Sequence, residues 1–128
     1  MSTAAAAAIV ATVVFAALAV LQLLVVVGKP YGRLVWGGAH RVLPAKLRIG
    51  SVVAIILYVT FTLVLLDRSG LLSVFGSRAF RVLAAWVLFA YLAIGIVLNA
   101  ISRSRPERFT MTPVTAVLAA CALVIAAS

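Results

Sequence analysis

The sequence predicts an all-α integral membrane protein, built as a bundle of four transmembrane helices. Hydrophobic residues make up 66% of its 128 residues and charged residues only 10%, whereas soluble domains carry about 25% charged residues. Four apolar segments reach or approach the roughly 17–25 residues that a helix needs to cross a bilayer core. The Lys and Arg residues lie in or beside the short segments between them. This length suits a single membrane domain, residues 1–128.

The four predicted spans are residues 4–27, 48–66, 81–101 and 112–127. No Lys or Arg precedes the first span, so it lacks the basic start of a signal peptide and we expect a permanent helix. The second and third spans are ordinary membrane helices by length. The fourth span is the shortest, and we expect Pro113 in its first turn, where the missing N–H group costs nothing.

Each span carries small or polar residues at spacings of three or four. Helices associate in lipid through such side chains, because lipid tails offer no hydrophobic driving force between helices. We therefore expect four stripes to converge on the bundle interior. They are Ala8, Thr12, Ala16 and Ala19; Ser51, Ala54, Tyr58 and Thr62; Tyr91, Gly95 and Asn99; and Thr115, Ala119, Ala122 and Ala126.

The basic residues are distributed unequally between the two sides of the bundle. The first connector (28–47), the third connector (102–111) and their flanks hold eight Lys and Arg residues, whereas the second connector (67–80) and its flanks hold three. The positive-inside rule places the first and third connectors in the cytoplasm and both termini outside. The Ala- and Val-rich, Lys-poor composition suits a bacterial source, and we expect a multi-pass protein of the bacterial cytoplasmic (inner) membrane.

The net charge of +9 does not indicate nucleic-acid binding. Basic residues in short connectors between apolar segments are explained by anionic lipid headgroups, which we expect as the partner, and no nucleic acid is expected. No cofactor and no metal are predicted, since one Cys, one His and two acidic residues are too few for a closed zinc site. No Asp, Glu, Lys or Arg lies in the interior of a predicted span, which argues against a proton-driven antiporter.

The first connector is the most probable site for a ligand. Pro and Gly residues divide it, and residues 33–41 are expected to form a short interfacial helix or re-entrant segment. On a helix, Arg33, Trp36 and His40 would share a side, and with Arg41 they would suit an anionic headgroup. An ordinary basic anchor with an interfacial Trp explains the same residues.

Two polar residues inside the spans extend this predicted site. Gln22 and Asn99 lie within about one or two helical turns of the cytoplasmic boundary. They either hydrogen-bond as structural contacts or line a shallow cavity that opens toward the first connector. The full predicted ligand-binding set also includes one residue of the third connector and reads Gln22, Arg33, Trp36, His40, Arg41, Asn99 and Arg105; no catalytic residue is assigned.

Three functions are compatible with these residues. The first is a non-enzymatic protein that binds an anionic or amphipathic ligand, most simply a lipid, at its cytoplasmic face. The second is a homo-oligomeric channel or carrier, or an accessory subunit of a larger membrane complex. The third is an enzyme acting on a lipid or isoprenoid substrate, which requires His40 and Glu107 within about 3.2 Å of each other, directly or through one water. Arg105 and Arg108 flank Glu107, so we expect it to form an ion pair within its own connector.

The connectors also carry a resemblance. The sequence resembles a group of small four-span bacterial membrane proteins, which supports the assignment of spans and implies no activity. The residues that carry this resemblance are Gly28, Pro30, Gly32, Trp36, Gly37, Gly38, His40, Leu43 and Pro44, then Arg48 to Ser51, Asn99, Ser102 to Arg108 and Met111 to Pro113.

Overall fold

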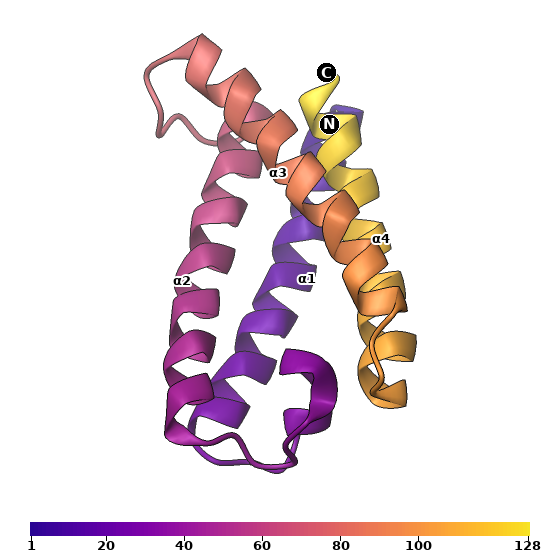
Figure 1. The fold of residues 1–128 in the computed structure, drawn as a ribbon. Helices are drawn as coiled ribbons and strands as arrows, with labels where there is room; N and C mark the ends of the chain where they lie inside the picture. Colours follow the sequence, from indigo (N-terminus) through magenta and orange to yellow (C-terminus); the bar gives the residue numbers. More distant parts are fainter.

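The computed structural model describes all 128 residues and contains four long helices and no strand. The helices are α1 (Thr3–Val26), α2 (Ala45–Arg68), α3 (Arg78–Ala100) and α4 (Arg105–Ala126). At 1.5 Å per residue each is about 33–36 Å long, enough for a hydrocarbon core of about 30 Å. All four are long and apolar enough to cross a membrane, so the predicted four-helix membrane bundle is confirmed (Figure 1).

The helix α4 begins about seven residues before the predicted fourth span. Its N-cap is Ser104, whose side chain accepts a hydrogen bond from the backbone N–H of Glu107. A Ser followed three residues later by Glu is a capping-box pattern that starts helices, and Pro106 occupies the first turn. Pro113 therefore lies inside α4, and its predicted place in the first turn is wrong. The third connector shortens accordingly.

The first connector does not form the short helix predicted over residues 33–41. It contains two single-turn 3-10 helices, η1 (Gly32–Leu34) and η2 (Trp36–Gly38). Gly37 and Gly38 have φ values of +74° and +72°, and this left-handed conformation cannot continue an α-helix. The segment folds back against the beginning of α4, and its predicted re-entry into the membrane stays a prediction.

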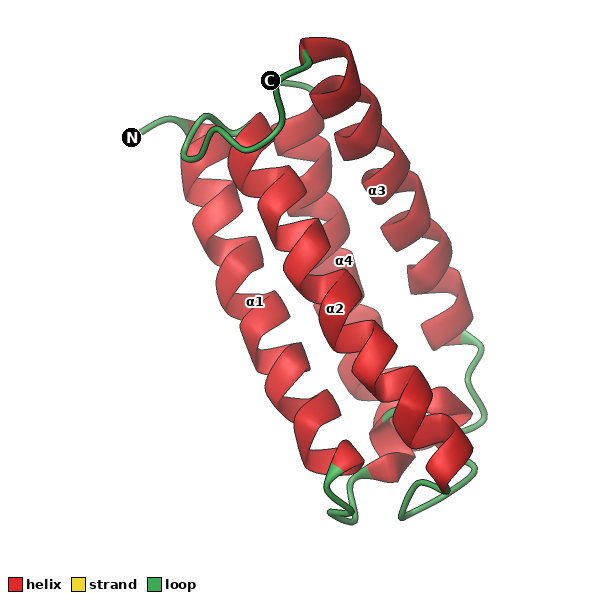
Figure 2. Cartoon of the chain, turned by 90° about the vertical axis from the view of Figure 1, so that its left-hand side faces the viewer, coloured by secondary structure: helices red, strands yellow, loops and turns green.

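The helices follow the spatial order α2, α1, α4, α3 (Figures 1 and 2). The helix α1 packs between α2 and α4, and α3 packs along α4, whereas α2 and α3 touch each other far less. These two approach at the connector-two end and diverge toward the first connector (Figure 1). Core side chains such as Ala8, Leu65, Leu88 and Ile125 lie in the half near the termini, so that half is closed and the other is open.

The predicted packing stripes are right for α4 and shifted for α1. Ala119, Ala122 and Ala126 are buried as expected. On α1, however, Ala16 is exposed, and the buried face continues from Ala8 through Phe15 to Gln22 and Val25. The large Phe15 ring packs against Tyr58 and Phe61 of α2. The side of α1 that bears Phe15 therefore faces the bundle interior, in place of the side that bears Ala16. On α3 the predicted stripe residue Tyr91 is 57% exposed, whereas the neighbouring Leu92 is buried.

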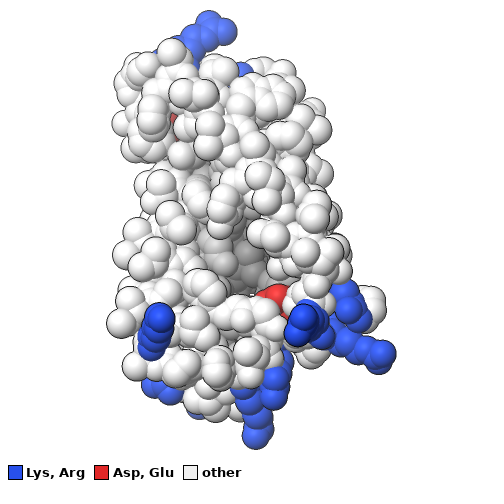
Figure 3. Space-filling model, in the orientation of Figure 1, with Lys and Arg blue, Asp and Glu red and all other residues white.

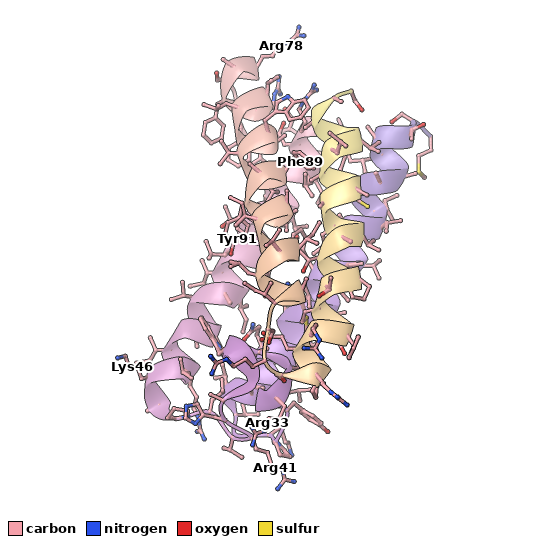
Figure 4. The ribbon with its side chains drawn as sticks, turned by 45° about the vertical axis from the view of Figure 1, so that its right-hand side comes forward. Arg33, Arg41, Lys46, Arg78, Phe89 and Tyr91 are labelled. Carbon is pink, nitrogen blue, oxygen red and sulfur yellow. The ribbon has the colours of Figure 1, made fainter.

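The two ends of the bundle carry the connectors that the charge distribution assigned to them. Connectors one and three lie at one end, and connector two lies with both termini at the other (Figures 1 and 2). Arg33, Arg41 and Lys46 lie at the first end and Arg78 at the opposite one (Figure 4). The connectors and termini that share each end of the bundle are therefore as predicted.

Connector two is fixed by a single acidic side chain. The Asp67 carboxylate accepts hydrogen bonds from the backbone N–H groups of Val74, at 2.7 Å, and Phe75. It also forms an ion pair with Arg81 at 3.4 Å. These contacts hold the start of α3 against the end of α2, which keeps the two helices together at this end only.

Candidate functional site

A cavity of about 660 Å³ lies between α2 and α3 in the open half of the bundle. Its volume is within the roughly 300–1,000 Å³ that is usual for ligand pockets. Hydrophobic residues make up 16 of its 24 lining residues, and α1 forms its back wall through Phe15, Leu18 and Gln22. Figure 3 shows the hollow from its open side, with an acidic group at its lower edge and Lys and Arg gathered at that end.

Trp36 forms the floor of the cavity at the connector-one end. Its Nε1–H donates a hydrogen bond to Oγ of Ser51 on α2 at 3.0 Å. The indole lies so close to the helix that a Cβ atom on Gly50 would be 2.9 Å from Cζ2 of Trp36. Trp36 also has a φ of +53°, a conformation that is uncommon for non-glycine residues and that surrounding contacts must hold. The Trp36 indole thus packs against α2 at Gly50 and Ser51.

A second set of contacts fastens connector one to the beginning of α4. The backbone N–H of Gly37 donates to Oε2 of Glu107 at 3.0 Å. Oγ of Ser104 donates to the carbonyl of Arg33 at 2.6 Å. Within connector one, the Arg33 guanidinium donates to the carbonyl of Gly38 at 2.6 Å. Connector one is therefore held on α2 by its indole and on the start of α4 by the Glu107 and Ser104 bonds.

Glu107 does not behave as the sequence predicted. The residue is only 7% exposed. Its carboxylate accepts a hydrogen bond from the Gly37 N–H group and forms no ion pair with Arg105 or Arg108. His40 is exposed, and no hydrogen bond or ion pair joins it to Glu107. The structure thus does not bring together the acid–base pair that the enzyme alternative requires.

Two pairs of polar side chains interrupt the apolar wall. Asn99 of α3 donates through Nδ2 to Oγ1 of Thr115 on α4 at 2.8 Å. Gln22 of α1 donates through Nε2 to the hydroxyl of Tyr58 on α2 at 3.4 Å. Gln22 is 6% exposed, and its Oε1 atom has no hydrogen-bond partner. The cavity therefore has a polar zone toward connector one and an apolar zone toward the middle of the bundle.

One cation lines the mouth of the cavity. Arg103 follows α3, four residues after Asn99, and its guanidinium makes no hydrogen bond or ion pair within the chain. This end of the bundle carries eight Lys and Arg residues and a single acidic residue, Glu107. Glu107 also lines the cavity, and its hydrogen bond from the Gly37 N–H group leaves its charge in place, so Arg103 and Glu107 bring opposite charges to the lining. The positive excess belongs to this end of the bundle as a whole, and that excess favours an anion near the mouth.

The predicted site residues divide into two groups. Gln22, Trp36 and Asn99 line the cavity, and their role in binding a ligand stays a prediction. The predicted residues that do not line it are Arg33, His40, Arg41 and Arg105; the first is bonded to the Gly38 carbonyl and the others are exposed.

Two polar lining residues, Tyr58 and Arg103, were not in the predicted ligand-binding set. Tyr58 was already on the stripe predicted to face the interior, so its signal was present. Arg103 lies beyond the end of α3 at Ala100, so helix periodicity could not have placed it, and only its position in the basic third connector pointed to it.

The structure brings together no group of three or more His, Cys, Asp or Glu side chains that could hold a metal ion. No protein-family model, curated protein or solved structure matches this chain. The function must therefore be argued from the cavity itself.

Proposed function

We propose that this protein binds an anionic amphiphile of the membrane in the cavity between α2 and α3. The chain of the ligand lies among the apolar side chains of the open half, and its anionic group lies at the mouth beside Arg103. The observation that carries this proposal is the cavity of about 660 Å³, which is apolar toward the middle of the bundle and polar toward connector one, where the unpaired Arg103 is among its lining residues. Amphiphiles have this same division between an apolar chain and a charged end.

We further propose that the cavity opens at the cytoplasmic side of a bacterial inner membrane, with both termini outside. The support is the excess of Lys and Arg at the end that bears connectors one and three, because basic residues accumulate on cytoplasmic loops. Anionic lipids of the cytoplasmic leaflet are attracted to such clusters by about 1 kcal/mol per Lys or Arg. The mouth therefore faces the region where anionic amphiphiles are concentrated.

Binding can be measured by native mass spectrometry of the protein released from detergent micelles. Oleyl phosphate is compared with oleyl phosphocholine, which has the same chain and no net charge. We expect severalfold more protein to retain oleyl phosphate. Arg103→Gln removes the cation at the mouth and should abolish this preference, whereas Arg78→Gln, at the opposite end (Figure 4), should preserve it.

The position of the chain is tested by filling the cavity. Ala54 lines it on α2, so a ring at this position occupies the space of the ligand, and Ala54→Phe should reduce retention severalfold. The matched control is Val53→Phe, because the neighbouring Val53 is 51% exposed on the outside of the bundle. Equal retention by both variants would contradict the proposal.

The alternative of a homo-oligomeric channel or carrier, or of an accessory subunit, places a helix of another chain in the opening between α2 and α3. It predicts a multimer in gentle detergent that Ala54→Phe disrupts. A monomer that retains oleyl phosphate favours the amphiphile.

A further inference from the structure

Gln22 has an unmet hydrogen-bonding requirement in the wall of the cavity. The side chain is 6% exposed and lines the cavity, yet its Oε1 atom has no partner. Buried polar atoms without a hydrogen bond are rare in native proteins, and each calls for an explanation. The cavity beside Gln22 is the place where such a ligand group would lie.

The Gln22 amide is held by one long hydrogen bond. That bond, from Nε2 to the Tyr58 hydroxyl, is 3.4 Å long, beyond the usual 2.7–3.2 Å of an N–H···O bond. The terminal torsion of a Gln side chain is broad rather than fixed in narrow wells. Because Oε1 is itself buried, a ligand group reaches it when the amide turns toward the cavity, at the loss of this one weak hydrogen bond.

We propose that the ligand is a single-chain amphiphile that carries a hydroxyl group between its chain and its anionic group, and that this hydroxyl hydrogen-bonds to the Gln22 amide. This inference rests on the proposed function. A hydroxyl group both donates and accepts hydrogen bonds, so it can serve the free Oε1 atom and also replace Tyr58 as a partner of Nε2.

The depths of the two polar groups determine where on the ligand the hydroxyl must be. Gln22 lies four residues before the end of α1 at Val26, about 6 Å inside the helix end. Arg103 lies beyond the end of α3 at Ala100, nearer the membrane surface. A hydroxyl at the tip of a large headgroup would lie on the side of Arg103 that is away from Gln22. The glycerol hydroxyl of a lysophospholipid, between acyl chain and phosphate, has the required position.

The size of the cavity favours one chain over two. A volume of about 660 Å³ is room for about 20 non-hydrogen atoms, if each takes on the order of the 30 Å³ of a water molecule. One oleoyl chain with its glycerol has about 25 non-hydrogen atoms, slightly more than this, and a second chain would have to lie outside, in the surrounding lipid.

The test is a competition between two ligands that differ by one oxygen atom. The protein in micelles is given equal amounts of 1-oleoylglycerol 3-phosphate and 1-oleoylpropane-1,3-diol 3-phosphate, which lacks the central hydroxyl. Native mass spectrometry resolves the two complexes in one sample. We expect the hydroxyl ligand to be favoured about tenfold, the effect of satisfying a buried polar group.

Gln22→Met keeps the volume of the side chain and removes its hydrogen bonds. In this variant the ratio of the two ligand complexes should fall to about one. Thr12→Val is the control on the same helix, because Thr12 bonds the carbonyl of Ala8 and does not line the cavity; it should keep the preference. Equal binding of the two ligands by the wild-type protein, a measurement that needs no variant, would overturn the hydroxyl contact and leave the proposed function intact. A preference that persists in Gln22→Met would overturn it as well. Retention of neither ligand by the wild-type protein would overturn both proposals.

Discussion

Two adjacent glycines of connector one allow the contact between connectors one and three to be measured. Gly37 and Gly38 have nearly the same left-handed φ values, +74° and +72°. A Cβ atom on Gly37 would have no heavy atom within 4 Å, whereas one on Gly38 would lie 2.2 Å from Cβ of Ser104 and 2.9 Å from the carbonyl oxygen of Arg33. The two Gly→Ala variants therefore share the backbone effect and differ in the steric effect.

The backbone effect of an L-residue in the left-handed region is about 1–2 kcal/mol, and this is the expected loss of unfolding free energy for Gly37→Ala. Gly38→Ala adds a carbon–carbon overlap of more than 1 Å, since such atoms prefer about 3.5–4.0 Å. Both obstructing atoms are backbone or directly attached to it, so no side-chain rotation relieves the overlap. Overpacking of this kind adds about 1–3 kcal/mol.

The assay is reversible unfolding in mixed micelles, with the fraction of denaturing detergent as the variable. Gly38→Ala should be less stable than Gly37→Ala by about 1–3 kcal/mol. Ser104→Gly removes the obstructing Cβ and changes an N-cap to a residue only a few tenths of a kcal/mol worse, so it should recover part of the loss in the Gly38→Ala background. Equal stabilities of Gly37→Ala and Gly38→Ala would refute the contact between the two connectors.

Three further predictions concern single contacts and the threading. Trp36→Phe removes the Nε1–H···Oγ bond to buried Ser51 and should lower the unfolding free energy by about 0.5–1.5 kcal/mol, with no further loss if Ser51 is already Ala. Asn99→Leu removes the hydrogen bond to Thr115. A double-mutant cycle with Thr115→Val should give an interaction free energy of about 0.6 kcal/mol, and at most about 1.7 kcal/mol. Cysteines placed at positions 40 and 70 in a Cys121→Ser background should react with an impermeant maleimide from opposite sides of the membrane, position 40 from the cytoplasm. Reaction of both from one side would contradict the threading.

The parts of the fold that the sequence predicts are those that depend on one segment at a time. A helix must satisfy every backbone polar group within its own segment in lipid, so apolar length alone identified the spans. The uneven distribution of Lys and Arg identified which connectors share an end. Gln22 and Asn99 were predicted site residues because a polar side chain inside an apolar segment is unfavourable unless it has a partner or a role, and both line the cavity.

The parts that the sequence does not predict depend on contacts between distant segments. The left-handed Gly37 is stabilised by Glu107, 70 residues further along the chain, and no local pattern reveals this pair. The spatial order α2, α1, α4, α3 is equally hidden, because the spans are apolar on nearly every face and several orders would satisfy the same short connectors. Without that order, the open side between α2 and α3 cannot be located, and Arg33, His40 and Arg41 appear as good a site as the cavity.

The surroundings of the cavity determine which of its residues could distinguish one proposed ligand from another. In water, an apolar space of this size between two helices would tend to close, because closing it would bury surface. In lipid that driving force is absent, since acyl chains are as apolar as the helices, and any chain can fill the space. The apolar zone therefore contributes little to discrimination between one membrane amphiphile and another. If the cavity binds an amphiphile as proposed, discrimination must arise where bulk lipid offers no equivalent contact, at Gln22 and Arg103, and these are the two positions at which substitution should change the choice of ligand more than the stability of the bundle.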